Sequence, residues 1–194
     1  MTVIYIREAG TKGYIRVGVE EAGKKHDFTV TESEYREAGS PLSRDILTRD
    51  EFSVLQYADL RYRAMIKALR VLAFGDNSEL MLSRKLMSAG FNKEVIDEVV
   101  SECVRLDYIN SERQLKKLIA GEVNIKNQGM GKIIPKLISK GYRRSQIESV
   151  ADMLLAGGEI DFDEAKARII SKLPPSATDE EIKKALYKNG HTVY

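Results

Sequence analysis

Polar and apolar residues alternate along much of the first thirty positions of this chain. Ile15, Val17 and Val19 are separated by single residues, which is the period-two pattern of a half-buried strand. Gly10 and Gly23 interrupt the pattern where turns are expected. We therefore predict a small three-strand meander, which is about the smallest sheet that is stable and which needs a neighbour to pack against.

After about residue 47, apolar positions recur every three to four residues, as they do in amphipathic helices. A residue that can cap a helix precedes most of these stretches. Leu47 and Phe52 are placed to close a hydrophobic staple around one cap. The expected helices cover about 31–39, 48–74, 78–89, 92–106, 110–127, 129–141, 145–156, 161–173 and 178–190. Their N-terminal signals are Thr31 with Glu34, Thr48 with Glu51, Asn92, Asn110, Asp161 with Glu164, and Thr178 with Glu181.

One short pattern occurs three times at a spacing of about fifty residues. The segments 85–91, 136–142 and 185–191 each have leucine second, glycine sixth and a ring-bearing residue last. Such a period is typical of stacked supersecondary units. We predict a mostly α fold of tandem three-helix repeats in an elongated, curved row, preceded by the small β-meander. The predicted segments are a strand-rich 1–47, repeats at 48–108 and 109–157, and an incomplete repeat at 158–194, whose third helix would begin near Tyr194.

The segment 129–141 predicts a short helix with one apolar and one basic stripe. Gly129 and Gly131 open it, and Gly141 closes it where helices often end in a left-handed turn. Pro135 is expected in the first turn, where a missing N–H costs least. The apolar stripe consists of Ile133, Ile134, Leu137 and Ile138, and the lysines on the adjoining face are Lys132, Lys136 and Lys140.

Two arginines follow where the next helix should begin. A helix N-terminus favours a polar acceptor and negative charge, but here it receives Arg143 and Arg144. We interpret this broken local rule as a sign of function.

Charge is distributed unevenly along the chain, although the net charge is only +2. Residues 113–144 contain nine basic residues and one acidic residue, whereas residues 145–165 contain six acidic residues and no basic one. Phosphate neutralisation needs lysines and arginines concentrated on one surface. With few acidic partners nearby, the basic segment predicts a nucleic-acid contact, and the alternative is a solvated helix face.

The sequence contains no recognisable catalytic apparatus. The glycines at 129 and 131 lack the spacing of a phosphate-binding loop. One cysteine, Cys103, and two histidines, His26 and His191, are too few for a zinc site. We expect no enzymatic activity, no cofactor and no bound metal. No apolar run is long enough to span a membrane, and the lone cysteine fits a reducing compartment, so we expect a cytoplasmic protein.

A series of motifs extends over the helical part of the chain. They are Asn77-Ser78-Glu79-Leu80, Lys85-Leu86, Gly90-Phe91, Ile96, Val99, Leu106-Asp107-Tyr108-Ile109-Asn110, Gly131-Lys132-Ile133, Leu137 and Lys140-Gly141-Tyr142. In this order they resemble the RecX family of bacterial recombination regulators, over roughly residues 62–190. The family usually has a Tyr-Leu-Asp-Asp turn where this chain has Tyr108-Ile109-Asn110-Ser111. Asn110 can still cap a helix, so the departure affects a charge and not the fold.

The resemblance implies a monomeric regulator in recombination, DNA repair and the SOS response. It would bind the RecA recombinase filament on DNA, contact single- and double-stranded DNA, and inhibit or modulate ATPase and strand exchange. The alternatives are a helical-repeat DNA- or RNA-binding protein with no recombinase partner and an enzyme of unrecognised type. The candidate contact residues are Arg84, Lys85, Lys116, Lys117, Lys126, Lys132, Lys136, Lys140, Arg143 and Arg144.

Overall fold

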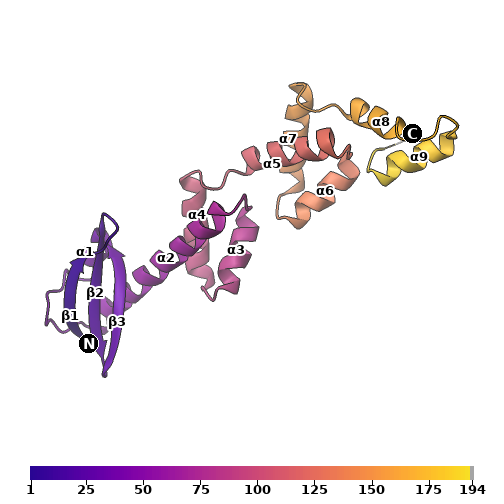
Figure 1. The fold of residues 1–194 in the computed structure, drawn as a ribbon. Helices are drawn as coiled ribbons and strands as arrows, with labels where there is room; N and C mark the ends of the chain where they lie inside the picture. The colour runs from indigo at the N-terminus through magenta and orange to yellow at the C-terminus, as the bar shows by residue number, and fades with distance from the viewer. Residues whose placement is uncertain (193–194) are drawn as a thin grey trace. The chain divides into compact units, whose positions relative to one another are not determined.

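The computed structural model describes residues 1–192, which form two compact units. Unit 1 comprises Met1–Phe74 and Ser83–Glu102, and unit 2 comprises Gly75–Leu82 and the chain from Cys103 onward. Among the described residues the fold is mostly helical with one small sheet near the N-terminus, as predicted (Figure 1). The segment boundaries inferred from the sequence stay predictions, and the expected helix start at Tyr194 lies outside the described residues.

The sheet of unit 1 is the predicted antiparallel meander. Its strands are β1 (Thr2–Glu8), β2 (Tyr14–Glu21) and β3 (Lys24–Thr31), in the order β1-β2-β3. The outer edge of β1 is covered by a loop: Val3 N–H donates to the Asp45 carbonyl at 2.9 Å, and Arg44 N–H donates to the Val3 carbonyl at 2.8 Å. This pairing satisfies backbone groups that an open edge would leave free.

One face of the sheet packs against the first turns of a long helix. Helix α1 (Glu32–Glu37) follows β3, and α2 (Arg49–Ala73) begins with the predicted capping box of Thr48 and Glu51. Phe52 and Leu55 of α2 are buried. The core they join also contains Val3, Val17, Val19, Phe28, Val30, Ala38, Leu47 and Ala58.

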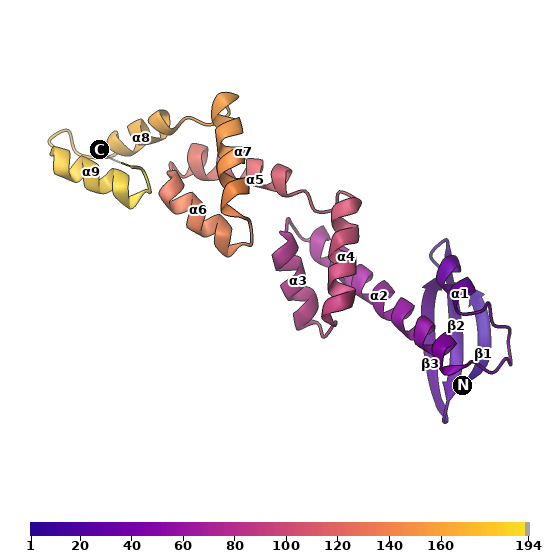
Figure 2. The ribbon, with the colours of Figure 1, turned by 180° about the vertical axis from the view of Figure 1, so that it is seen from behind.

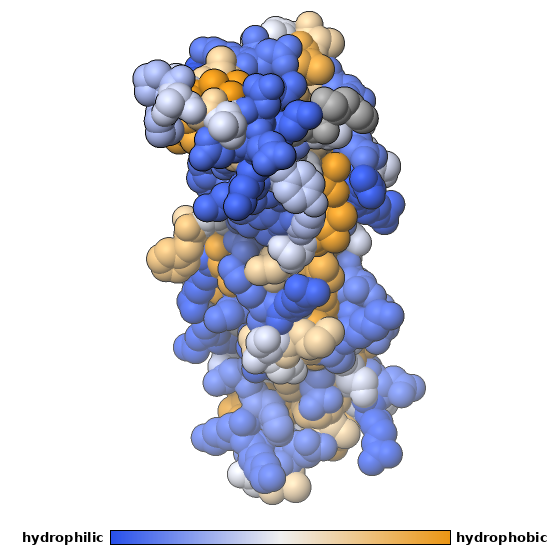
Figure 3. All heavy atoms as spheres, turned by 90° about the vertical axis from the view of Figure 1, so that its right-hand side faces the viewer, coloured by the Kyte–Doolittle hydropathy of each residue, from blue (hydrophilic) through white to orange (hydrophobic). Residues whose placement is uncertain are grey.

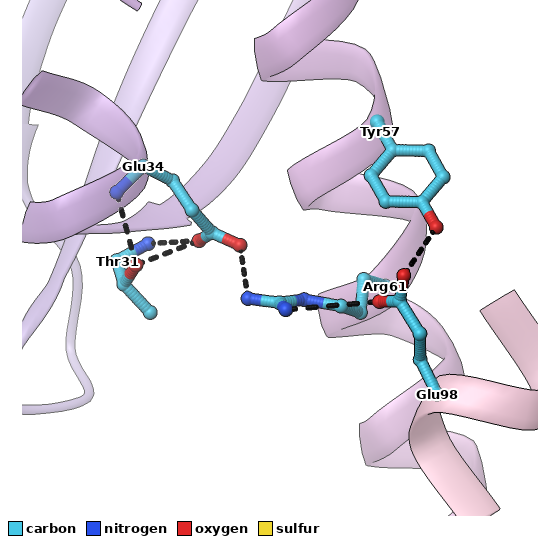
Figure 4. A network of polar contacts seen from close by, with 5 residues as sticks. All are labelled: Thr31, Glu34, Tyr57, Arg61 and Glu98. Atoms are coloured by element: carbon cyan, nitrogen blue, oxygen red, sulfur yellow. Dashed lines mark hydrogen bonds and ion pairs between the residues drawn. The ribbon is translucent and has the colours of Figure 1, made fainter. Parts of the chain in front are cut away.

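A polar network connects three helices of unit 1 (Figure 4). The Arg61 guanidinium pairs with Glu34, whose other oxygen closes the capping box of α1, and it also lies 3.7 Å from Glu98 Oε2. Glu98 belongs to α4 (Lys93–Arg105) and accepts a 2.8 Å hydrogen bond from the Tyr57 hydroxyl. Burial, together with this bond to Glu98, raises the pKa of Tyr57 to about 12. The network therefore fixes α1 and α4 to the same stretch of α2.

Side chains cap the next two helices, and the second of these caps was predicted. Helix α3 (Glu79–Ser88) begins after Ser78, whose hydroxyl accepts the Met81 N–H at 3.2 Å. Asn92 caps α4 by accepting the Val95 N–H at 3.0 Å. The first four residues of α3 belong to unit 2 and the rest to unit 1.

Unit 2 contains five α-helices in its described part. They are α5 (Ser111–Ala120), α6 (Met130–Ser139), α7 (Arg144–Ala156), α8 (Phe162–Ile170) and α9 (Asp179–Lys188). Helix α5 continues into a π-helical segment, η1 (Gly121–Ile125). Together, α5 and η1 correspond to the helix that the sequence predicted to reach about Asn127. Helices α5, α6 and α7 lie together in both ribbon views (Figures 1 and 2) around a shared apolar core. Its largest fully buried side chains are Leu115, Ile119, Ile133, Leu137, Ile147 and Leu154.

The pattern found three times in the sequence is one recurring helix end. Gly90, Gly141 and Gly190 have φ values of 89°, 93° and 83°, in the left-handed region that favours glycine. The residue after each glycine donates its N–H to the carbonyl of the recurring leucine, at 3.3 Å for Phe91, 3.2 Å for Tyr142 and 3.1 Å for His191. This is the Schellman arrangement, and it explains why leucine, glycine and a ring recur at fixed spacing.

Two of these turns pack against the first turn of another helix. At the end of α6, the Ser78 hydroxyl donates to the Lys140 carbonyl, and Leu80 lies against Gly141. At the end of α9, the carbonyls of residues 189 and 190 accept the N–H groups of Gly129 at 2.9 Å and Gly131 at 3.0 Å. A Cβ at Gly129 would collide with the Gly190 carbonyl, so the two glycines that open α6 permit a close backbone approach.

The structure corrects two expectations about α6. Pro135 is the sixth residue of the helix and not part of its first turn, because the helix begins at Met130, directly after Gly129. Ile133, Ile134 and Leu137 are buried as predicted, but Ile138 is 45% exposed because the core reaches only one side of this last turn.

Packing at Gly141 predicts an unequal response to alanine. A Cβ at Gly141 would lie 2.6 Å from Leu80 Cβ, whereas one at Gly158, which also has positive φ, would meet nothing within 4 Å. Backbone strain should cost about 1–2 kcal/mol in both variants. Gly141→Ala should lose a further amount of about 1–3 kcal/mol from overpacking. Urea unfolding followed by circular dichroism measures the difference, and equal losses would contradict the packing role of this turn.

Candidate nucleic-acid interface

The nine basic residues of the segment 113–144 all lie in unit 2, and all but Arg113 are candidate contact residues. Arg113, Lys116 and Lys117 are on α5, Lys126 follows η1, and Lys132 and Lys136 are on α6. Lys140 is the C-cap of α6, Arg143 is the N-cap of α7, and Arg144 is the first residue of α7. Arg84 and Lys85, the other two candidates, are on the part of α3 that belongs to unit 1.

Six of these nine cations are paired, so the expectation of few acidic partners is wrong. Glu112, Glu148 and Asp107 lie just outside the basic segment and pair with it at short sequence spacing, whereas Asp76 meets Lys117 only through the fold. The pairs are Arg113–Asp107 at 2.7 Å, Lys116–Glu112 at 2.8 Å, Lys117–Asp76 at 3.3 Å, Lys126–Glu122 at 2.7 Å, Lys136–Glu122 at 2.7 Å and Arg144–Glu148 at 2.8 Å.

Glu122, the one acidic residue of the segment, holds two of the lysines. Its side chain is only 7% exposed, and one oxygen, Oε1, accepts from both Lys126 and Lys136. Burial by itself would raise the pKa of Glu122, but the hydrogen bonds and positive charges of the two lysines outweigh burial and lower it. The carboxylate therefore anchors η1 to α6 and takes Lys136 out of the freely solvated strip predicted from its spacing.

Three cations of the stretch have no ion-pair partner among residues 1–192: Lys132, Lys140 and Arg143. All three are exposed, and they follow one another along α6 and the turn into α7. Lys132 and Lys140 are eight residues apart, so they remain on the same side of the helix. Lys140 also suits the negative end of the α6 dipole.

Arg143 occupies the N-cap position without capping the helix. A guanidinium has no acceptor for a backbone N–H, so only half of a capping box forms, in which Gln146 Oε1 accepts the Arg143 N–H at 3.1 Å. Its positive charge also opposes the dipole at the start of α7. The local cost inferred from the sequence is therefore present at Arg143, whereas Arg144 is compensated by Glu148.

Sequence reasoning missed two further groups of basic residues. On α2, Arg63, Lys67 and Arg70 line a cavity of about 350 Å³ together with Tyr62 and Ile66. Their spacing of four and three along one helix was the signal that could have revealed them. The second group, on α9, contains Lys183, Lys184 and Lys188. Both groups lie outside the window in which basic residues outnumber acidic ones.

The described residues were also searched for metal sites and for membrane-spanning helices. Within positions 1–192, no cluster of histidine, cysteine, aspartate and glutamate has the arrangement of a metal site. None of the helices described is long and apolar enough to cross a membrane. On the face drawn in Figure 3, hydrophilic residues predominate and hydrophobic ones form smaller groups.

Comparison with known proteins gives a consistent result, although no family model matches the chain. Regulatory protein RecX of Clostridioides difficile is 25% identical over 73% of this chain and 65% of its own length, so the match spans just under two thirds of that relative. Regulatory protein RecX of Caldanaerobacter subterraneus is 24% identical over 100% of this chain and 94% of its own length.

Solved structures agree in fold. A crystal structure of a regulatory protein RecX superposes with a TM-score of 0.74 at 17% identity, covering 98% of this chain and 94% of that one. RecX from Lactobacillus salivarius gives a TM-score of 0.60 at 20% identity, covering 70% of this chain and 90% of its own. The chain is thus similar to regulatory RecX proteins in sequence and shares the fold of the solved RecX structures. This confirms the resemblance carried by the sequence motifs.

The turn before α5, which departs from the usual RecX pattern, still caps the helix. Asn110 Oδ1 accepts the Arg113 N–H at 2.9 Å, and its amide donates to Asp107 at 2.8 Å. Asp107 also pairs with Arg113, and these hydrogen bonds lower the pKa of Asp107. The neutral Asn110 therefore keeps the capping function while Asp107 supplies the negative charge of the turn.

Glu122 should make stability depend on pH in acid. Because its folded pKa is lowered, its contribution is present above the pKa of an unfolded glutamate and is lost as the pH falls through the folded pKa. Glu122→Gln should cost about 1–3 kcal/mol at pH 7, as loss of hydrogen bonds to a charged group does. The difference from the parent should vanish in acid, where the parent carboxyl is also neutral. Denaturant unfolding across pH measures it.

Glu112→Gln is the matched control for this measurement, because Glu112 pairs with Lys116 on the surface. It should cost no more than about 1 kcal/mol at any pH. Equal effects of the two substitutions would contradict the anchoring role of Glu122.

Proposed function

We propose that this protein binds the RecA recombinase filament on DNA and restrains its ATPase and strand-exchange activity. The observation that carries the proposal is the agreement with regulatory RecX proteins, which in one relative extends over the whole chain. The cations of unit 2 give the proposal a physical basis, because a filament assembled on DNA exposes phosphates and a binding partner must neutralise some of them.

Lys132, Lys140 and Arg143 are the residues best suited to this contact. They are exposed and have no ion pair to break among the described residues, so contact with a phosphate costs them no existing interaction. A charge that already has a carboxylate partner gains less from a phosphate, because it exchanges one anion for another.

The paired cations divide into two classes by the cost of that exchange. Lys116 and Lys117 are paired at the surface, where such pairs contribute only about 0–1 kcal/mol, so they can turn to a phosphate at little cost. Lys126 and Lys136 pair with the buried Glu122, and their departure would leave that carboxylate uncompensated. We therefore expect the first class to contribute less to binding than the three unpaired cations do, and the second class to have structural roles.

The unpaired cations can be tested against an equal number of paired ones. Lys132, Lys140 and Arg143 are replaced by alanine, and the affinity for DNA is measured at several salt concentrations. The slope of log affinity against log salt concentration should become shallower by up to about 0.7–0.9 for each residue that meets a phosphate. Suppression of recombinase ATPase should weaken in parallel. The control replaces Arg113, Lys116 and Lys117, which changes the net charge by the same amount and should have a smaller effect.

The outcomes of that experiment separate the possible partners. An unchanged salt slope with lost ATPase suppression would move these cations from DNA to the recombinase surface. No change in either measurement would refute the site. Binding of the protein to DNA but not to purified recombinase without DNA would favour the alternative of a nucleic-acid-binding protein with no recombinase partner.

Arg143→Asn should improve stability while weakening binding. Asparagine can accept the Gln146 N–H that arginine leaves without a side-chain cap, and it removes a charge that opposes the helix dipole. The expected gain is about 1 kcal/mol in the free energy of unfolding. Thermal melting and DNA titration of the same preparation measure both effects, and a loss of stability would show that Arg143 is retained for structure.

A further inference from the structure

The last two turns of α9 expose an aromatic ring among lysines. Tyr187 is 78% exposed, and Lys183, Lys184 and Lys188 are exposed around it. Within the described part of the chain, these lysines form no ion pair, and the ring of Tyr187 has no aromatic or hydrogen-bonding partner. Most tyrosines of folded proteins cover at least part of their ring, so this combination needs an explanation.

Helix geometry brings these side chains onto neighbouring positions. Tyr187 lies one turn after Lys183 and Lys184, and Lys188 lies one turn after Lys184. The acidic residues of α9 are all in its first turn, where Glu181 is held by Thr178 in a capping box. The helix is therefore negative at its beginning and positive at its end.

The basic end of α9 meets the beginning of α6. The Gly190 carbonyl accepts the Gly131 N–H at 3.0 Å, and a Cβ at Gly190 would lie 2.6 Å from the backbone nitrogen of Lys132. Lys188 lies two residues before Gly190 in the chain, and the backbone of Lys132 lies against Gly190. The unpaired charges of α6 thus continue onto α9, although the two helices are almost fifty residues apart in sequence.

A ring surrounded by cations fits one ligand better than others. Single-stranded nucleic acid presents both phosphates and unpaired base faces, and stacking of a base on an aromatic side chain contributes to binding whatever the sequence. A duplex offers the phosphates but keeps its base faces stacked inside. An acidic protein surface would use the lysines but gives the ring no defined role.

We propose that Lys183, Lys184, Tyr187 and Lys188, together with Lys132, form a site for single-stranded nucleic acid. The lysines contact phosphates, and one base stacks on Tyr187. The inference rests on the proposed function, in that it names the form of nucleic acid that the basic surface of unit 2 recognises.

The test compares Tyr187→Ala and Tyr187→Phe with the parent protein. A labelled single-stranded oligonucleotide and its duplex are titrated separately, without recombinase, and anisotropy is recorded. Tyr187→Ala should weaken single-strand binding about 5- to 150-fold, as loss of one stacked base does. Tyr187→Phe should bind as the parent does, because it keeps the ring. Duplex binding should change less than about 2-fold, and the salt slope should not change, because stacking releases no counterions.

Two control variants accompany the test. Tyr108→Ala removes another exposed ring, 50% exposed and outside the proposed site, and should leave single-strand binding unchanged. Lys184→Ala with Lys188→Ala should flatten the salt slope for both forms of DNA. Since Tyr187 is exposed, the melting temperature of Tyr187→Ala should match the parent and exclude misfolding.

The inference is overturned if Tyr187→Ala binds single strands normally, or if it weakens duplex binding equally. It is also overturned if only recombinase suppression is lost, since the ring would then contact protein. If Tyr187→Ala has no effect but the Lys132, Lys140 and Arg143 variant loses DNA binding and suppression, only this inference fails. If the parent protein does not suppress recombinase ATPase while Tyr187→Ala loses single-strand binding, the proposed function fails and this site remains.

Discussion

The close packing of a glycine turn against the first turn of another helix is the contact on which unit 2 depends. Gly141 packs against Leu80, and Gly190 packs against Gly129 and Gly131. Each contact needs a left-handed residue at the helix end, and a Cβ on that residue would collide with the neighbouring helix. A Cβ at Gly90 would meet nothing within 4 Å. The period of about fifty residues therefore records the recurring helix end, and two of its three copies also carry a packing contact.

The same contacts decide where charge is available. Packing of α6 on η1 buries Glu122, and the buried carboxylate then fixes Lys126 and Lys136. Packing of α9 on α6 brings a second basic helix end to Lys132. What appears in the sequence as one run of cations is therefore a mixture of structural and free charges. Only the free ones can neutralise phosphate without loss, which gives the proposed recognition of a DNA-bound filament its physical selectivity.

Unit 1 is built on different interactions. Its sheet is closed on one edge by the loop at 44–45 and packed on one face against α2. Arg61 joins this part to α4 through carboxylates on both sides. A surface pair is weak by itself, but a guanidinium between two carboxylates also orients both helices it touches. The basic cavity on α2 belongs to this unit, and none of the residues that line it belongs to unit 2.

Local order was predictable from the sequence, because caps, strand alternation and helix ends depend on residues a few positions apart. Thr48 with Glu51, Asn110 and the glycine turns were all identified in this way, and the motif order was sufficient to predict the similarity to RecX proteins. Pairs four residues apart, such as Lys116 with Glu112, follow from helix spacing, but only the tertiary structure brings Lys136 to Glu122 and Lys117 to Asp76. It also decided the role of Gly129 and Gly131, whose partner is Gly190. Electrostatic and steric contacts depend on distance in space, and sequence spacing does not specify that distance once the helices pack.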